Sequence, residues 1–144
     1  MKQLEKLHGA SASPRYETFV KLNKLWEQYV LTLLGKDDPL NPAHMASICS
    51  KVVKADLTGA DIKVVAAKNP TLLGVGGIVV RESVRCLFVI APDENSLKNL
   101  IKAGTVFEVR LPHCKIRVWG DNIIHLGSER TKVKFKERYQ LDLY

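Results

Sequence analysis

The sequence predicts a mainly β protein, in which two N-terminal helices precede a small six-stranded antiparallel barrel and a basic C-terminal segment. Short runs rich in Val and Ile recur between residues 60 and 126, separated by clusters of Gly, Pro, Asn, Asp and Ser, as in short strands joined by turns. Within residues 13–55, apolar residues recur at spacings of three and four, as in amphipathic helices. We expect residues 1–12 to be a mobile end, 13–55 to form the helices and 56–144 to hold the barrel.

The two expected helices share the same start signal. In Ser13-Pro14 a serine N-cap satisfies a free amide and proline presets the first helical residue. Gly35 is expected to end this first helix, whereas Asn41-Pro42 should start a second one that runs to about Lys54. The first helix carries an apolar stripe formed by Phe19, Leu22, Trp26, Tyr29, Val30 and Leu33.

The apolar stripe of the first helix must be covered by another surface. One interpretation is that it packs on the chain's own barrel. The other is that it binds a protein partner, because Trp26 and Tyr29 are large amphipathic residues of the kind enriched at interfaces. The candidate partner-binding residues are Phe19, Leu22, Trp26 and Tyr29.

Three of the six strands are expected between Ala60 and Ile90, where apolar residues occupy most positions on both faces. The other three are expected at Thr105–Leu111, Lys115–Trp119 and Asn122–Leu126. Between the two groups, Leu97–Ile101 is expected to form one helical turn. Six short strands at this spacing are typical of a small antiparallel barrel.

The glycine-rich run from Gly74 to Gly77 does not predict a nucleotide site. It lacks the G-x-G-x-x-G spacing, no Lys-Ser/Thr pair follows it, and it opens into Ile78 and further β-branched residues instead of a helix. We expect the glycines to supply positive φ and a bend at a barrel corner.

Composition and cysteine usage exclude several classes of function. The hydrophobic fraction of 46% fits one globular domain, no apolar run is long enough for a membrane span, and the start does not read as a signal peptide. Cys49, Cys86 and Cys114 have no Cys-x-x-Cys spacing, so we expect buried thiols, no zinc ribbon and no cofactor. The scattered histidines and carboxylates predict neither a metal site nor a catalytic site.

The formal net charge of +7 is concentrated in the β-rich half. Residues 1–59 hold 8 Lys+Arg against 6 Asp+Glu, and residues 60–144 hold 14 against 9. Such an excess suggests a polyanionic partner, most often nucleic acid. The strongest candidate segment is GSERTKVKFKER (127–138), which a helix or a strand would fit, although it could also be a solvated tail. Its candidate RNA-binding residues are Arg130, Lys132, Lys134, Lys136 and Arg138.

Five basic residues outside this segment could share a surface with it and meet phosphates. These candidates are Lys68, Arg81, Arg85, Lys115 and Arg117. Phosphate contacts of this kind carry no base specificity. Trp119, Phe88 and Phe107 are the aromatic residues that could stack on bases, although the two phenylalanines are better suited to the core.

The run KVVAAKNPTLLGVGGIVVRES (63–83), the Ala103–Phe107 strand entry and the 127–138 segment together resemble the Sm-like protein subunit shared by ribonuclease P and ribonuclease MRP. The resemblance covers about residues 55–143. It implies an Sm-like barrel and a non-catalytic, RNA-bound accessory subunit in the nucleus and nucleolus, with cleavage performed by the RNA component. Implied partners are that catalytic RNA, a small zinc-ribbon subunit and other protein subunits. Implied processes are 5′-leader removal from precursor tRNA and pre-rRNA cleavage.

Two other functions remain open from the sequence. The glycine-rich turn between two strands on a basic half also resembles the KOW-type element of ribosome-associated proteins, over about ten residues. Alternatively, the chain is a protein-interaction module that binds through the helix containing Trp26, without RNA binding.

Overall fold

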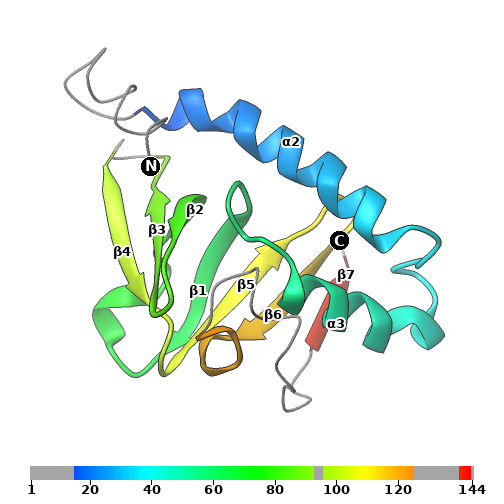
Figure 1. Ribbon diagram of the computed structural model, residues 1–144. Coiled ribbons are helices and arrows are strands. Elements are labelled where there is room, and N and C mark those ends of the chain that lie inside the picture. Colours follow the sequence, from blue (N-terminus) through cyan, green and yellow to red (C-terminus); the bar gives the residue numbers. More distant parts are fainter. Residues whose placement is uncertain (1–14, 93–95, 125–139, 144) are drawn as a thin grey trace.

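The computed structural model describes residues 15–92, 96–124 and 140–143. These residues form two α-helices and one antiparallel sheet with the strand order β4-β3-β2-β1-β5-β6-β7 (Figure 1). The strands are β1 (Asp61–Ala67), β2 (Gly76–Glu82), β3 (Cys86–Ile90), β4 (Leu97–Ile101), β5 (Thr105–Arg110), β6 (Cys114–Trp119) and β7 (Gln140–Leu143). The helices are α2 (Tyr16–Leu34) and α3 (Met45–Lys54), with the 3₁₀ helices η1 (Pro42–His44), η2 (Pro70–Leu72) and η3 (Gly120–Ile123).

The predicted class, mainly β with two N-terminal helices, is confirmed. Bulges in β1, between Val64 and Ala66, and in β2, between Val79 and Arg81, interrupt the register of the central strands and bend them. In the described ranges β4 and β7 are the two edges of the sheet, so the sheet is open. The term barrel therefore describes it only loosely.

The expectation of a helical turn at Leu97–Ile101 is wrong, because this segment is strand β4. Leu100 is opposite Leu87 in β3, and both side chains are fully buried. Lys102, two positions further on, is buried as well. This period of two is a strand pattern, but the spacing of Leu97, Leu100 and Ile101 also fits a helix and favoured the wrong choice.

The expectation of a sixth strand at Asn122–Leu126 is also wrong for its described part, because Gly120–Ile123 forms η3. Gly120 lies directly against the turn between β4 and β5, where an added Cβ would overlap the carbonyl oxygen of Lys102. The carbonyl oxygen of Ile123 accepts a hydrogen bond from the Lys102 ammonium at 2.7 Å. This segment therefore packs on the turn instead of extending the sheet.

Helix α2 begins at Tyr16, later than Ser13-Pro14 predicted, because Arg15 is still extended with φ −120° and ψ 134°. Its predicted end is confirmed: Gly35 has φ 58°, and its N–H donates to the carbonyl oxygen of Leu31. The second start signal is confirmed too, since the side chain of Asn41 accepts from the N–H of Ala43 and η1 leads into α3. α3 ends at Lys54, as expected.

Helix α2 runs across the top of the sheet in Figure 1, and its stripe packs on this chain. Trp26 is 3% exposed, and its indole N–H donates to the carbonyl oxygen of Asp56 at 2.7 Å. Phe19 is buried in a small cluster with Ile78 and Ile90. The burial of Phe19 and Trp26 favours packing on the chain's own sheet, while binding of a partner to α2 stays a prediction.

The predicted bend at the glycines is confirmed at Gly74 and Gly77, which have φ values of 82° and 154°. At Gly77 a Cβ would overlap the carbonyl oxygen of Ile90 on the neighbouring strand. Glycine is therefore needed there for the close approach of β2 and β3 as well as for its backbone conformation.

Lys102 is the one charged residue in the described ranges that is fully buried, and three other segments meet at this residue. The ammonium forms an ion pair with Glu82 at the end of β2, at 2.8 Å, and donates to the carbonyl oxygen of Ile123 in η3. The backbone N–H of Lys102 donates to the carbonyl oxygen of Arg85 in the β2–β3 turn. The two charges stabilise each other only as a pair, because either one alone in this site would be buried without compensation.

We expect Lys102→Met to lower the free energy of unfolding by about 3–5 kcal/mol, because it leaves the Glu82 carboxylate buried without its partner. Adding Glu82→Leu should recover part of that loss, since no uncompensated charge then remains. Urea denaturation of the two single variants and the double variant measures this coupling.

The matched control is Lys51→Met, which breaks an ion pair of similar length, 2.8 Å to Asp37, on the surface. It should cost no more than about 1 kcal/mol. A Lys102→Met variant that is as stable as the Lys51→Met control would show that the buried pair does not stabilise the fold.

Candidate nucleic-acid interface

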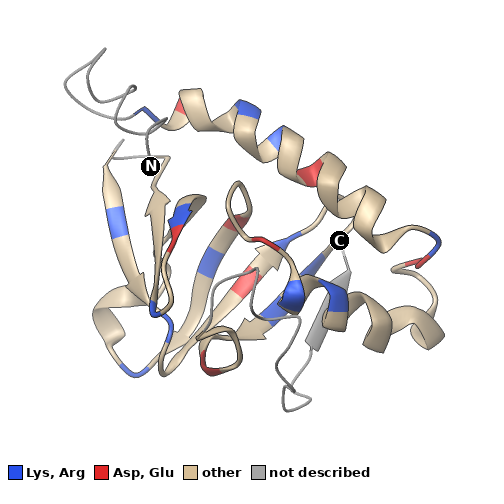
Figure 2. Cartoon of the chain, in the orientation of Figure 1, with Lys and Arg blue, Asp and Glu red and all other residues tan. Residues whose placement is uncertain are grey.

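The outer face of β1, β5 and β6 carries a group of charged side chains, which we call the outer row. It is the face turned away from the main core, and Figure 2 shows blue and red bands on these strands. The register sets Asp61 opposite Arg110, Lys63 opposite Glu108, Glu108 opposite Arg117 and Arg110 opposite Lys115. Residues directly opposite each other on adjacent strands lie on the same face. The outer row consists of Asp61, Lys63, Glu108, Arg110, Lys115 and Arg117.

The outer row has four basic and two acidic residues, so its formal charge is positive. Glu108 lies in its middle, between Lys63 and Arg117, and its carboxylate is 3.8 Å from the Lys115 ammonium. This ion pair is long and partly exposed, and such pairs contribute little stability. The arrangement holds cations on both sides of one carboxylate and leaves an excess of positive charge for an anionic ligand.

Three of the predicted RNA-binding residues, Lys68, Arg81 and Arg85, lie at or next to turns between strands, and we call them the turn cluster. The backbone N–H of Lys68 donates to the carbonyl oxygen of Gly104, in the turn between β4 and β5 that also contains Lys102. Arg85 contacts Lys102 through its carbonyl oxygen. The guanidinium of Arg81 lies over the ring of Phe88, 5.3 Å from its centroid, so part of its charge faces an aromatic surface.

The structure therefore assigns the described candidates to two groups. Lys115 and Arg117 belong to the outer row, whereas Lys68, Arg81 and Arg85 form the turn cluster. The sequence analysis missed Lys63 and Arg110 as interface candidates, and their signal was alternation with buried neighbours on β1 and β5. Five further candidates lie outside the described residues: Arg130, Lys132, Lys134, Lys136 and Arg138.

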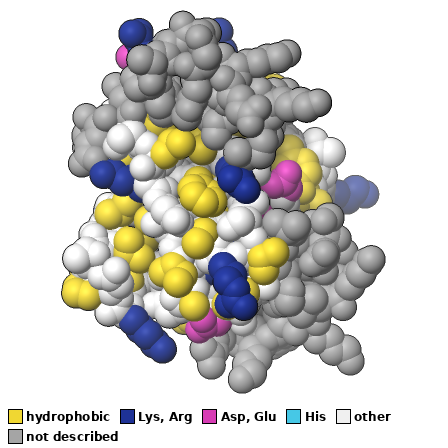
Figure 3. All heavy atoms as spheres, turned by 60° about the vertical axis from the view of Figure 1, so that its left-hand side comes forward, with side chains coloured by type: hydrophobic (Ala, Val, Ile, Leu, Met, Phe, Trp, Pro, Cys, Tyr) yellow, Lys and Arg dark blue, Asp and Glu magenta, His cyan; other side chains and the backbone are white. Residues whose placement is uncertain are grey.

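The three aromatic candidates for base stacking differ in burial. Phe107 is buried in the core, as expected, and cannot meet a ligand. Phe88 is half-buried and lies beneath Arg81, and Trp119 is half-buried on β6. On the face of the molecule where β2, β3 and β4 come forward, apolar side chains lie between separated Lys and Arg side chains (Figure 3).

The cysteines are the other side chains that could carry chemistry. Cys49 and Cys114 are buried, as predicted, and burial raises the pKa of both thiols to about 11, while Cys86 is only half-buried. Within the described ranges, no three His, Cys, Asp or Glu residues come close enough to hold a metal ion. In the same ranges no helix has the length and apolar character to cross a membrane.

The described residues thus define a small antiparallel β protein whose two helices cover the sheet and whose outer face is basic. The family described as ribonuclease P/MRP, subunit p29, matches residues 50–133. This chain belongs to that family, which confirms the resemblance found in the sequence.

Individual relatives support the same membership. The chain is 35% identical to the human ribonuclease P protein subunit p29 over 129 residues, which cover 90% of this chain and 57% of the human protein. It is 30% identical to the RNases MRP/P 32.9 kDa subunit of Saccharomyces cerevisiae, over 87% of this chain and 48% of the yeast protein. For the ribonuclease MRP protein subunit POP4 of Arabidopsis thaliana the identity is 28%, over 86% of this chain and 40% of the relative. The chain spans about half the length of these relatives.

The carboxyl group of Asp61, in the outer row, has a raised pKa. Burial raises the pKa of its carboxyl group above the ordinary value of 3.8, Arg110 opposes this shift, and Glu27 adds to it. A raised pKa means that the native state holds the proton more tightly than the unfolded state. The stability that this proton contributes is therefore lost as the pH rises above 3.8 and through the raised pKa of Asp61.

We expect Asp61→Asn to raise the melting temperature at neutral pH and to flatten the fall in stability over that window, because the amide carries no charge to be desolvated. Thermal unfolding from pH 3.5 to 7, roughly the range in which carboxyl groups titrate, checks this. Asp37→Asn is the control, and it should lower stability at neutral pH instead of raising it. Hydrogen bonds from Lys51 and Ser47 lower the pKa of Asp37, so its charged form stabilises the native state. Lower stability of Asp61→Asn at neutral pH would contradict the expectation.

Proposed function

We propose that this chain is a non-catalytic, RNA-binding subunit of ribonuclease P, ribonuclease MRP or both. The observation that supports this most strongly is the family match, together with relatives named as subunits of both particles. The outer row adds a physical reason, because its excess of Lys and Arg suits a polyanion and phosphate contacts can hold a protein on RNA without reading bases. The chain would thus brace an RNA that performs the cleavage.

The proposal includes the finer features that the sequence resemblance implies. The particle would remove 5′ leaders from precursor tRNA or cleave pre-rRNA, in the nucleus and nucleolus. Its catalytic RNA, a zinc-ribbon protein and other protein subunits would be the partners of this chain. No cofactor is needed by the chain itself, since its role is to bind and position.

Protein partners would have an exposed apolar surface on α2 to contact. Leu25 is 62% exposed and Tyr29 is 42% exposed, and they lie one helical turn apart beside the buried stripe of α2, where the Tyr29 hydroxyl accepts a hydrogen bond from the backbone N–H of Asp56 at 3.4 Å. An exposed Leu and Tyr beside the buried stripe of a helix suit a small interface. We therefore propose that Tyr29 contacts a protein partner, as predicted from the sequence, together with Leu25.

Co-purification with a tagged full chain tests the proposal. The expected result is one structured RNA with several proteins and cleavage of precursor tRNA or pre-rRNA by the particle but not by the isolated chain. Recovery of ribosomes would favour the KOW-type function, and recovery of proteins without RNA would favour the interaction module. Cleavage by the isolated chain after all RNA has been removed would overturn the non-catalytic role.

The basic segment is tested by its salt dependence. Replacing Lys132, Lys134 and Lys136 with Gln should flatten the plot of log affinity against log salt by about 2–3 units, because each neutralised phosphate contributes about 0.7–0.9. Affinity for unrelated RNAs should fall about equally. The control replaces three exposed lysines on and after α2, namely Lys21, Lys24 and Lys36. If both triple variants have the slope of the unaltered chain, the segment is only solvated.

The partner surface on α2 is tested by Leu25→Ala with Tyr29→Ala. We expect fewer protein subunits to co-purify while the melting temperature stays close to that of the unaltered chain, because surface substitutions change stability by about 0.5 kcal/mol or less. Trp26→Ala is the contrasting variant and should mainly lower the melting temperature, by removing a buried ring and its hydrogen bond to Asp56. Full co-purification with the double variant would exclude this surface.

A further inference from the structure

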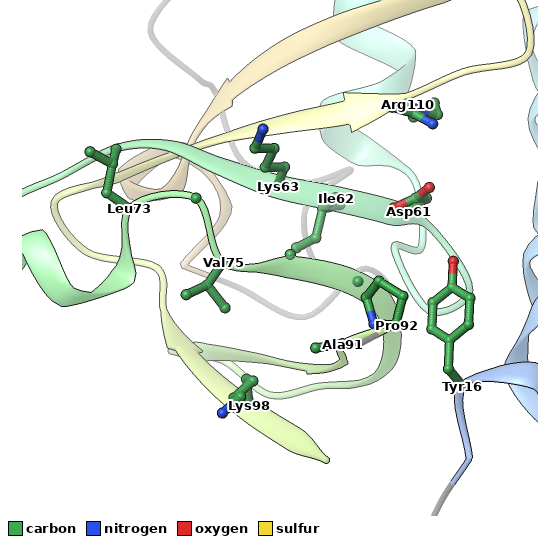
Figure 4. Close-up of a pocket in the computed structure, with 13 residues that line it drawn as sticks. Tyr16, Asp61, Ile62, Lys63, Leu73, Val75, Ala91, Pro92, Lys98 and Arg110 are labelled. Atoms are coloured by element: carbon green, nitrogen blue, oxygen red, sulfur yellow. The ribbon is translucent and has the colours of Figure 1, made fainter. Parts of the chain in front are cut away.

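A pocket of about 610 Å³ opens on the outer face of the sheet, beside the first turn of α2 (Figure 4). Its apolar lining comes from Ile62, Val75, Ala91 and Pro92. The ring of Tyr16 stands at one side, with its hydroxyl directed toward Asp61. The volume lies in the range of pockets that hold small organic ligands, which is about 300–1,000 Å³.

The charges around the pocket are mainly positive. Lys63, Lys98 and Arg110 line it together with one carboxylate, Asp61. Burial and the charge of Asp61 raise the pKa of the Tyr16 hydroxyl, so that group stays protonated and can act as a hydrogen-bond donor. The lining thus combines apolar surface, one aromatic ring, cations at the rim and a carboxylate that can accept hydrogen bonds.

The pocket is continuous with the outer row, because Asp61, Lys63 and Arg110 belong to both. An extended anionic chain bound along Lys63, Arg110, Lys115 and Arg117 would therefore pass the mouth of the pocket. Double-stranded RNA could contact these cations but could not place a stacked, paired base in the pocket. A single-stranded segment could do both.

We infer that this pocket binds one unpaired nucleotide of single-stranded RNA. Its base enters between Tyr16 and the Val75–Gly77 segment, while the flanking phosphates meet Lys63 and Arg110. Asp61 accepts a hydrogen bond from an N–H of the base. The inference rests on the proposed RNA binding and deepens it, because it adds recognition of an unpaired base to contacts that the phosphates alone would make with any RNA.

The test compares a short single-stranded oligouridylate with a duplex RNA, for the unaltered chain and for Tyr16→Leu. Leucine keeps apolar packing against the cluster around Phe19 but removes the stacking ring. Loss of one stacked base should weaken single-strand binding about fivefold to a hundredfold, with duplex binding unchanged. Leu31→Ala, at an exposed apolar residue elsewhere on α2, is the control and should bind both RNAs as the unaltered chain does.

A second measurement needs no variant. Photocrosslinking of the unaltered chain to a thiouridine-substituted single strand should yield crosslinked peptides that contain Tyr16, Pro92 or Val75–Gly77. Crosslinks confined to other segments would overturn the inference. An equal loss of affinity for the single strand and the duplex in a folded Tyr16→Leu chain would overturn it too. Weaker assembly of the Tyr16→Leu chain with protein subunits, at unchanged RNA affinity, would also overturn the inference. Failure of the unaltered chain to bind either RNA would instead show that the proposed function is wrong.

Discussion

The buried ammonium of Lys102 constrains the architecture more than any other single group. A lysine without solvent contact must keep both its charge and its hydrogen-bond donors satisfied. It does so by drawing together the end of β2 through Glu82 and the short helix η3 through Ile123. Its own backbone joins the β2–β3 turn. Segments far apart in the sequence thus meet at one point, which also fixes the turns that carry Lys68 and Arg85.

The location of the charged face follows from what the helices and strands bury. α2, α3 and the inner sides of the strands enclose one apolar core, which includes Trp26, Val52, Val79 and Phe107. Charged side chains on β1, β5 and β6 are therefore confined to the outer face. α2 covers that face only around Phe19 and leaves the surface beside Tyr16 open. The pocket therefore lies where α2 no longer covers the sheet.

Much of the fold could be predicted because its signals are local. Gly35 and Asn41-Pro42 act within one turn of their positions, and the β-branched runs between Gly and Pro clusters gave the central strands. β4 and η3 were predicted wrongly because their conformations depend on distant partners. Leu100 is fixed by its pairing with Leu87, and Ile123 by the side chain of Lys102. The partner in each contact lies far away in the sequence and cannot be identified from the segment itself.

The candidate site was likewise predictable only where its signal is local to one strand. Alternation on β6 placed Lys115 and Arg117 outward, but their neighbours Lys63 and Arg110 come from β1 and β5 through pairing that the sequence does not state. Tyr16 could not be placed, because its position depends on where α2 crosses the sheet.

If the basic face binds RNA as proposed, its carboxylates would give it a selectivity that net charge alone would not provide. Glu108 has cationic neighbours on β1 and β6, so a phosphate placed directly over it would meet a like charge, whereas phosphates on either side would meet Lys63 or Arg117. Like-charge juxtaposition disfavours ligands of the wrong spacing, and specificity arises from such repulsion as much as from attraction. A flexible single strand can adjust its phosphates around Glu108 more readily than a duplex, whose phosphates are held at a fixed spacing. The alternation of charge along the outer row and the open pocket beside Tyr16 therefore favour the same kind of ligand.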